Sequence, residues 1–539
     1  MKKQLFLALA VAATMSAIAQ NTPAKTEPAK SVQAPKQERR PDVLAGLIRG
    51  PYLQMATSKS IVIRWRTNAL TRSVVNFGSS ENNLDQQAED PALTFEHQVQ
   101  LTGLSPRTKY YYAIGGGAGD TLQKGKDNFF VTLPVPGDEG FYRIGILGDC
   151  GNNSTNQRQV RDQVEKYIGD DKPMDAWILL GDNAYSSGTD PEFQEKFFNI
   201  YRDNFLKKYP LFPSPGNHDY NDFYRFKATA QSTHDIAYYQ NFTMPTKGEA
   251  GGVPSGTEAF YSFDIGNVHF LSLDSYGKED NATRLYDTTG AQVNWIKKDL
   301  EAYNQNPKRG WIVAYWHHPP YTMGSHNSDK EEELVKIREN FIRILERYGV
   351  DLIVCGHSHL YERSRLMHGH YGMEATFNAA TNNLSTSSAL YDGSDNSCPY
   401  IKKSGEQGTV YVVTGSAGAS GKNQPTYPHD AFYYSKYEIG GASMLEVQGS
   451  RLELKWICAD GVIRDHFVMM KDVNKTQKIQ LKKGETTTLT ASFVGDYKWN
   501  KSADTGRSIK VKPPVGKTTY EVRDANSCVK DIFEITVAK

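Results

Sequence analysis

The 539-residue chain has almost no net charge, few cysteines and no long apolar run beyond its first residues. Its 62 Lys and Arg residues nearly balance 61 Asp and Glu residues, which argues against a nucleic-acid partner held by bulk electrostatic attraction. The five cysteines form no CxxC zinc pair, and their disulfide pairing stays open. No later stretch reaches ~18 uncharged apolar residues, so we expect no transmembrane segment.

The first residues are typical of an export signal. Met1-Lys2-Lys3 is basic, Leu5 to Ile18 is apolar, and Ala17-Ile18-Ala19 is a small-residue cleavage site. The apolar run is too short to span a bilayer. The cleavage site has no cysteine near it, which argues against a lipid anchor. We therefore predict a signal peptide over residues 1–19 and a mature protein that is secreted, periplasmic or at the cell surface.

Composition divides the remaining chain into four parts. Residues 20–45 are rich in Pro, Ala, Lys and Gln, which predicts a disordered linker. Residues 46–135 carry short strand patterns broken by Gly, Asn and Pro, and these predict a β-sandwich. Residues 138–470 alternate strand and helix patterns, which predicts an α/β domain. Residues 473–539 predict a small immunoglobulin-like β domain.

The first β region carries a recognisable local motif. Residues 104–112 read Leu-x-Pro-x-Thr-x-Tyr-x-Tyr, which resembles the fibronectin type III signature. In that signature the Tyr, here Tyr110, holds a corner and the Leu packs in the core. We also expect Trp65 in the core, and separate strands over 60–65 and 73–77.

Five short polar blocks organise the α/β region, and each ends or follows an apolar run that predicts a buried strand. The third block has the weakest such run. The blocks are Gly148-Asp149-Cys150-Gly151, Gly181-Asp182-Asn183-Ala184-Tyr185, Gly216-Asn217-His218-Asp219, the run from His317 through Tyr321 to His326, and Gly356-His357-Ser358-His359. In open α/β sheets, ligands gather outside the carboxyl ends of the strands. The blocks therefore predict one crevice that holds metal ions, and two ions suit this number of ligands.

The residue types indicate which metals suit the crevice. Asp149 and Asp182 offer carboxylates and Tyr185 offers a phenolate, and these hard oxygen donors favour Fe(III). A carbonyl and imidazoles that suit Zn, Fe(II) or Mn come from Asn217, His317 and His357. Asp182 is the natural bridge between two metals, because it shares a loop with Tyr185. His357 and His359 are two residues apart, so on an extended segment they point to the same side.

Taken together, the five blocks and the extension Leu360-Tyr361-Glu362-Arg363 resemble the purple acid phosphatases of the calcineurin-like metallophosphoesterases. The resemblance covers roughly residues 50–467, with the fibronectin-like domain included. It implies a four-layer α/β/β/α sandwich, flanked here by an N-terminal β-sandwich and a small C-terminal β domain. The implied ferric ligands are Asp149, Asp182, Tyr185 and His359. The implied ligands of the divalent ion (Zn, Fe or Mn) are Asp182, Asn217, His317 and His357.

The resemblance also implies an activity. It predicts a secreted acid phosphatase that hydrolyses phosphate monoesters by attack of a metal-bound hydroxide. His218 and His326 would face the phosphate, and His326 would protonate the leaving group. Asp219 would orient His218, and His318 would form part of the pocket wall.

Two other interpretations stay open. A phosphodiesterase or nucleotide hydrolase could use the same two metals. Alternatively, the chain could be a non-catalytic surface adhesion protein, and in either case the terminal β domains could make cell-surface or oligomer contacts. The role of the Asn/Ser/Gly-rich segment 366–407, which directly follows the last block, also stays open.

Overall fold

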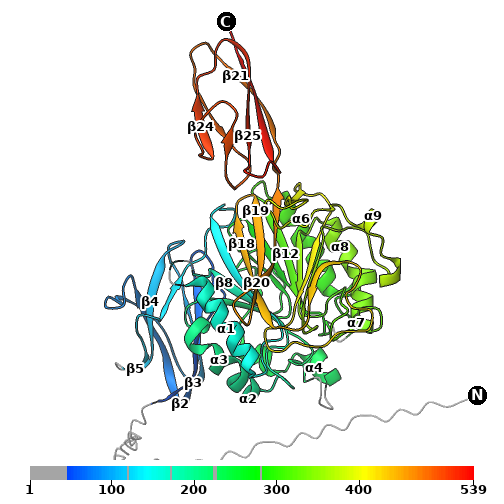
Figure 1. Ribbon diagram of the computed structural model, residues 1–539. Helices are drawn as coiled ribbons and strands as arrows, with labels where there is room; N and C mark the ends of the chain where they lie inside the picture. Colours follow the sequence, from blue (N-terminus) through cyan, green and yellow to red (C-terminus); the bar gives the residue numbers. More distant parts are fainter. Residues whose placement is uncertain (1–44, 118–119, 170, 172, 222–226, 280–281) are drawn as a thin grey trace, which may run out of the picture. The chain divides into compact units, whose positions relative to one another are not determined.

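The computed structural model describes residues 45–117, 120–169, 171, 173–221, 227–279 and 282–539 (Figure 1). The predicted signal peptide and nearly all of the predicted linker lie outside these residues. The domain boundaries expected from composition stay predictions, and the sheets are described one by one below.

The N-terminal β region is a six-stranded sheet. Its strands are β1 (Leu47–Gln54), β2 (Ile61–Gly78), β3 (Gln86–Leu101), β4 (Lys109–Gly117), β5 (Asp120–Gln123) and β6 (Phe129–Val131). The expectation of separate strands over 60–65 and 73–77 was wrong, because both belong to the single long strand β2. Trp65 is buried, and the Tyr110 hydroxyl accepts a hydrogen bond of 3.0 Å from the backbone N–H of Ser105, as the corner motif predicts.

The central region contains two seven-stranded sheets. The first runs β15 (Tyr400–Lys402), β20 (Ile463–Lys471), β19 (Arg451–Cys458), β18 (Gly441–Gln448), β7 (Phe141–Leu147), β8 (Ala176–Leu180) and β9 (Leu211–Ser214). The second runs β10 (Tyr261–Ile265), β11 (Val268–Ser272), β12 (Trp311–Trp316), β13 (Leu352–Cys355), β16 (Val410–Thr414), β14 (Tyr361–Ser364) and β17 (Phe432–Lys436).

Each of the five polar blocks follows a strand of these two sheets. Strands β7, β8 and β9 are parallel neighbours in the first sheet, and β12 and β13 are parallel neighbours in the second. The apolar run before the third block, the weakest pattern in the sequence, forms the four-residue strand β9. Parallel neighbours end at the same edge of a sheet. Three blocks therefore meet at an edge of the first sheet, and two meet at an edge of the second sheet.

Alternating side chains of β12 show how the layers are stacked. Trp311, Val313 and Tyr315 pack into the apolar core shared with the first sheet. Ile312, Ala314 and Trp316 pack into a second core, against helices on the other face. This two-residue period places one sheet between two apolar layers, as the four-layer fold requires. In Figure 1 the helix α1 lies on one side of the sheets, and α6, α7 and α8 lie on the other.

The helices are α1 (Thr155–Ile168), α2 (Asp190–Phe193), η1 (Gln194–Phe198), α3 (Asn199–Tyr201), η2 (Arg202–Leu206), α4 (Lys227–Thr233), α5 (Ala237–Asn241), α6 (Ala291–Gln305), α7 (Glu332–Lys336), η3 (Ile337–Phe341), α8 (Ile342–Arg347), η4 (Glu374–Thr376) and α9 (Ala379–Asn382). Ser154 caps α1 by accepting a hydrogen bond from the N–H of Gln157, at 3.0 Å. The amphipathic pattern over 331–348 forms α7 and α8, which the π-helical turn η3 joins.

The C-terminal β region has its own apolar core. One sheet holds β21 (Thr476–Leu481), β26 (Lys530–Val537), β25 (Gly516–Arg523) and β23 (Lys498–Trp499), and the other holds β22 (Thr487–Thr490) and β24 (Ser508–Val511). A disulfide joins Cys528 of this region to Cys398 in the long segment 366–407. The sequence left this pairing open, because nothing in the spacing selects two partners 130 residues apart.

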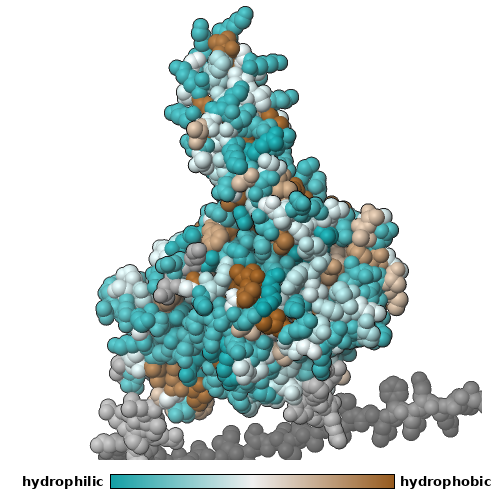
Figure 2. Space-filling model, in the orientation of Figure 1, coloured by the Kyte–Doolittle hydropathy of each residue, from teal (hydrophilic) through white to brown (hydrophobic). Residues whose placement is uncertain are grey.

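Figure 2 shows a largely hydrophilic face with small, scattered apolar patches. Within the described ranges, none of the helices combines the length and the apolar character that crossing a membrane requires.

His269, on strand β11 of the second sheet, is a fully buried histidine that contacts two carboxylates and lies outside the five blocks. Its Nδ1 lies 2.7 Å from an oxygen of Asp264, and its Nε2 lies 2.6 Å from an oxygen of Asp299. Burial opposes protonation of His269, but the effect of the two carboxylates is larger and raises the pKa of His269 to about 10. His269 therefore belongs to the core and not to the group of predicted metal ligands.

We expect this ion triad to make stability fall in alkaline solution. The folded-state pKa of His269 lies above the unfolded value of about 6.5, so its contribution is complete below about pH 6.5 and is lost as pH rises through about 10. His269→Gln should therefore flatten the alkaline fall of the thermal unfolding midpoint. The matched control is His97→Gln, because burial lowers the pKa of His97 to about 4 and its contribution is lost on the acid side. Equal alkaline slopes in wild type and His269→Gln would contradict this.

The disulfide should hold the C-terminal β region to segment 366–407. Replacing Cys398 and Cys528 together by Ser should cost about 2–4 kcal/mol of stability, because the unfolded chain then loses a long closed loop. Calorimetry measures this as an unfolding transition at a lower temperature. A reducing agent should move the wild-type transition in the same direction and leave that of the double variant unchanged.

Candidate metal centre

The loops that follow the strands are shaped by strained residues and by glycines. Asp149, Asp182 and His357 all have positive φ angles, of 56°, 52° and 68°. Such backbone costs about 1–3 kcal/mol per residue and persists where the surroundings enforce it. Gly216 and Gly356 allow the loops to approach closely, since a Cβ on either would lie 2.3 Å from Asp182 Oδ1 or 2.5 Å from Asp149 Oδ2.

One group of side chains surrounds His317. Its Nδ1 donates to the carbonyl of Leu180 at 2.8 Å, so its Nε2 points into the crevice. This nitrogen lies 3.2 Å from Asp182 Oδ2, 3.0 Å from Asn217 Oδ1 and 3.1 Å from His357 Nδ1. Four atoms that can all offer lone pairs thus face one another.

This arrangement fits a cation. Burial opposes protonation of His317, but the carboxylates of Asp182 and Asp149 raise its pKa to about 9, so this point attracts positive charge. Burial and the charge of His326 lower the pKa of His357 to about 3, which leaves a neutral imidazole able to act as a ligand. Carboxylate, amide and imidazole donors together suit a divalent transition metal.

A second group surrounds Tyr185. Its hydroxyl lies 3.0 Å from Asp149 Oδ1, to which it donates, and 3.0 Å from His359 Nε2. Burial raises the pKa of Tyr185, and the charges of Asp149 and Asp182 raise it further. A phenolate at this position therefore needs a cation beside it.

Asp182 belongs to both groups. Burial works against its ionisation, yet the imidazoles of His317 and His218 hold its pKa far below the ordinary value. The possible ligand atoms of Asp149, Asp182 and His317 all lie within 4.8 Å of one another. Two adjacent cations that share Asp182 fit this geometry. The structure thus brings all seven predicted ligands together, and their role as ligands stays a prediction.

A cavity of about 360 Å³ opens above these groups. His218 and His326 line it, and the ring of His326 stacks on that of His357 at 3.6 Å between centroids. The Nδ1 of His218 lies 2.6 Å from the carbonyl of Ser186. Both predicted non-ligand histidines therefore border the space where a substrate would sit.

Two further residues of the blocks can now be located. Asp219 accepts hydrogen bonds from the N–H of Gly216 at 2.8 Å and from the side-chain amide of Asn183 at 2.9 Å, and its predicted role in orienting His218 stays a prediction. It therefore ties the second block to the third. His318 lines the cavity wall, as expected, with its Nδ1 2.8 Å from the Ser275 hydroxyl.

Glu331 is a cavity residue that the sequence interpretation did not single out. Its Oε2 lies 2.8 Å from His326 Nδ1 and 3.4 Å from His357 Nε2, and its Oε1 accepts a hydrogen bond from the N–H of Asn327. Burial opposes ionisation of Glu331, but the hydrogen bonds from both histidines hold the pKa of Glu331 below its ordinary value. Glu331 is also the N-cap residue of α7, a position where a carboxylate suits the helix dipole, so its sequence position alone does not indicate a contact with the histidines.

Comparison with known proteins agrees with the geometry. Residues 142–361 match the calcineurin-like phosphoesterase family, and residues 49–132 match the N-terminal domain of purple acid phosphatases. The chain thus carries a calcineurin-like phosphoesterase domain and a purple acid phosphatase N-terminal domain, in that family's arrangement. Likeness to this family implies a binuclear metal centre, and the clustered side chains are where this chain could hold one.

Curated relatives carry the same family name. The chain is 28% identical to purple acid phosphatase 15 of Arabidopsis thaliana over 336 residues, which is 55% of this chain and 58% of the relative. It is 24% identical to acid phosphatase type 7 of Danio rerio over 454 residues, 77% of this chain and 88% of the relative. The alignments with purple acid phosphatases 15, 23 and 21 of Arabidopsis thaliana span 58%, 57% and 65% of those proteins, which is less than two thirds of each.

A solved structure shares the fold. The purple acid phosphatase PPD1 of yellow lupin seeds superposes with a TM-score of 0.57 at 18% identity, over 80% of this chain and 74% of that one. At this identity the likeness establishes the fold, and it agrees with the four-layer architecture expected from the sequence.

Glu331 should strengthen metal binding through His357. Glu331→Gln removes the charge that holds the His357 ring, and loss of such a partner typically lowers metal affinity about 10–100-fold. Metal content after dialysis against a chelator measures this. The matched control is Glu333→Gln, because Glu333 lines the same cavity but pairs with Arg284 at 3.6 Å. Equal metal loss in both variants would argue against a specific role for Glu331.

Proposed function

We propose that the chain is a metal-dependent acid phosphatase that hydrolyses phosphate monoesters. The observation that carries this is the convergence of carboxylate, phenol, amide and imidazole groups around two adjacent points, with Asp182 between them. Likeness to the calcineurin-like phosphoesterases and the purple acid phosphatases supports the same reaction class.

We assign the side chains to two different cations. Asp149, Tyr185 and His359 would hold Fe(III) together with Asp182, because phenolate and carboxylate oxygens favour a small, highly charged ion. Asn217, His317 and His357 would hold a divalent ion, Zn, Fe or Mn, again with Asp182. When bound, two adjacent cations supply Lewis-acid stabilisation of phosphoryl charge and activate water for attack on phosphorus.

The remaining cavity residues would act on the substrate directly. His218 and His326 can donate hydrogen bonds to phosphoryl oxygens, which stabilises the charge that develops in the transition state. The carboxylate of Glu331 at Nδ1 of His326 keeps the other ring nitrogen directed to the cavity, from where a proton can reach the leaving alkoxide. Hydrogen bonding of the His218 ring to the carbonyl of Ser186 fixes its orientation in the same way.

The site of action we propose is outside the cytoplasm. The Cys398–Cys528 disulfide supports this, because disulfides persist in oxidising compartments. The predicted export signal agrees with it.

One preparation tests the metal assignment and the reaction together. Protein purified in air should contain two metal ions per chain, show a visible absorption band and release phosphate from nitrophenyl phosphate, most rapidly below neutral pH. The same protein should be slower on bis-nitrophenyl phosphate, and a preference for this diester would favour the phosphodiesterase alternative. Bound metal without any phosphate release would favour a non-catalytic surface protein.

Tyr185 supplies the sharpest control. Tyr185→Phe should abolish the visible band while part of the activity remains, because the phenolate sets the colour more than the attack. Tyr276→Phe changes another tyrosine of the same cavity and should keep the band. An unchanged spectrum in Tyr185→Phe would refute the assignment of Tyr185 to the ferric ion.

A further inference from the structure

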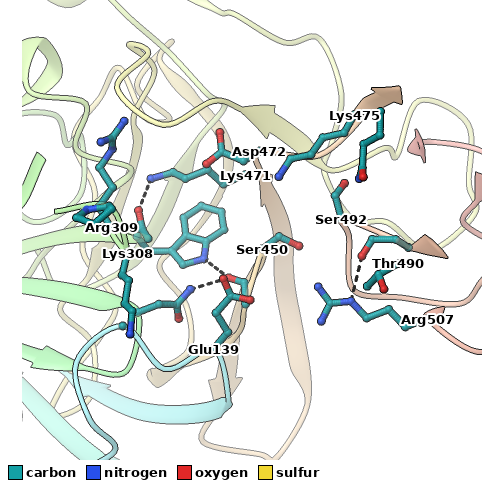
Figure 3. A pocket seen from close by; sticks show the side chains of 18 residues that line it. Glu139, Lys308, Arg309, Ser450, Lys471, Asp472, Lys475, Thr490, Ser492 and Arg507 are labelled. Atoms are coloured by element: carbon teal, nitrogen blue, oxygen red, sulfur yellow. Dashed lines mark hydrogen bonds between the residues drawn. The ribbon is translucent and has the colours of Figure 1, made fainter. Parts of the chain in front are cut away.

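A second cavity, of about 620 Å³, lies at the other end of strand β12 from the metal centre (Figure 3). Trp311 begins β12 and lines this cavity, whereas His317 follows the end of the strand. The walls come from the segment before β12, from the β18–β19 turn with the end of β20, and from the C-terminal β region. Cavities of this size can enclose a ligand of a few rings.

The C-terminal β region, which forms one side of the cavity, is tied to another part of the chain. The Cys398–Cys528 disulfide connects the C-terminal β region to segment 366–407. The hydroxyl of Tyr391, in that segment, also donates to Asp524 at 2.9 Å. A covalent bond and a part-buried hydrogen bond therefore attach the C-terminal β region, which supplies part of the cavity wall, to segment 366–407.

Positive charge predominates around the cavity. Lys475 and Arg507 lie on one side and Lys308 and Arg309 on the other, as Figure 3 shows. Among the described residues, the ammonium groups of Lys308 and Lys475 have no hydrogen-bond or ion-pair partner. Lys471 adds no free charge, since it pairs with the buried Asp351. An anionic group would be attracted to these side chains.

Two polar atoms in the wall also lack partners within the described chain. Asn267 is only 5% exposed, and its Nδ2 donates to the carbonyl of Gly449, but its Oδ1 accepts no hydrogen bond. The Oγ of Ser450 is buried and equally unpaired. Buried polar atoms are normally satisfied, so these two suit a ligand that carries hydroxyl groups.

The aromatic residue of the cavity is not available for stacking. Trp311 is 1% exposed, its indole N–H donates to the carbonyl of Gly449, and Lys471 Nζ lies 5.0 Å from the ring centroid. A nucleobase would find no ring face here, and an apolar ligand would meet mostly polar groups.

We propose that this cavity binds an anionic oligosaccharide. Carboxylate or sulfate groups would pair with Lys475 and Arg507, and sugar hydroxyls would satisfy Asn267 and Ser450. This binding is independent of the phosphatase reaction, because no residue of the cavity belongs to the metal centre.

Calorimetric titration of the full chain tests the proposal with three probes: an oligogalacturonate, a heparin-derived oligosaccharide and a neutral dextran oligosaccharide. Each titration is run with and without inorganic phosphate, because phosphate occupies the metal centre but, as an anion, also competes for the lysine and arginine side chains of the cavity. At least one anionic probe should bind, less tightly as salt rises, and the neutral probe should not. Which anionic probe binds distinguishes carboxylated from sulfated ligands.

Charge variants locate the binding. Lys475→Glu combined with Arg507→Glu should weaken binding about tenfold or more, and Glu139→Gln should strengthen it, because it removes a carboxylate from the wall. The matched control is Lys517→Glu, an exposed change on β25 outside the cavity. No binding of either anionic probe, equal binding of the neutral probe, or an equal loss in the Lys517 control would overturn the proposal.

Discussion

Two buried carboxylates, Asp149 and Asp182, are the constraint on which the rest of the centre depends. They are 0% and 2% exposed, and an unpaired ionised carboxylate at such depth costs several kcal/mol. The surrounding imidazoles, the Tyr185 hydroxyl and the backbone N–H of His357 offset part of that cost. Metal cations at the two points would offset more of the cost of burying the carboxylates. The residues that destabilise the fold without a metal are therefore the ones suited to be ligands.

The two-sheet architecture is what makes this concentration of charge possible. Each strand delivers one short loop to a common edge, and the apolar layers behind the edge hold the loops in strained conformations. The positive φ angles of Asp149, Asp182 and His357 illustrate this, because a stand-alone loop would relax out of them. Asp219 and Glu331 then fix neighbouring loops and rings, so that the side chains stay aligned.

The C-terminal β region contributes differently. It carries none of the predicted metal ligands, yet a disulfide and a hydrogen bond from Tyr391 to Asp524 join it to the segment that follows the last block. Its junction with the central region forms a cavity whose lining is cationic and polar, at the opposite end of β12 from the metals. A catalytic edge and a binding edge on one sheet would let a single chain hydrolyse small esters while attached to an acidic glycan.

Sequence alone was sufficient for the parts that depend on local pattern. Apolar runs followed by Gly-Asp, Gly-Asn-His and Gly-His-x-His predicted the strands, the shared edge and the candidate ligands, because strand period and ligand chemistry are properties of neighbouring residues. Tertiary structure alone decided what depends on distance in space. It joined two expected strands into β2, paired Cys398 with Cys528, brought Glu331 to His326 and His357, and turned Asp219 toward Gly216 and Asn183. These contacts join residues through packing or loop geometry that no local pattern records.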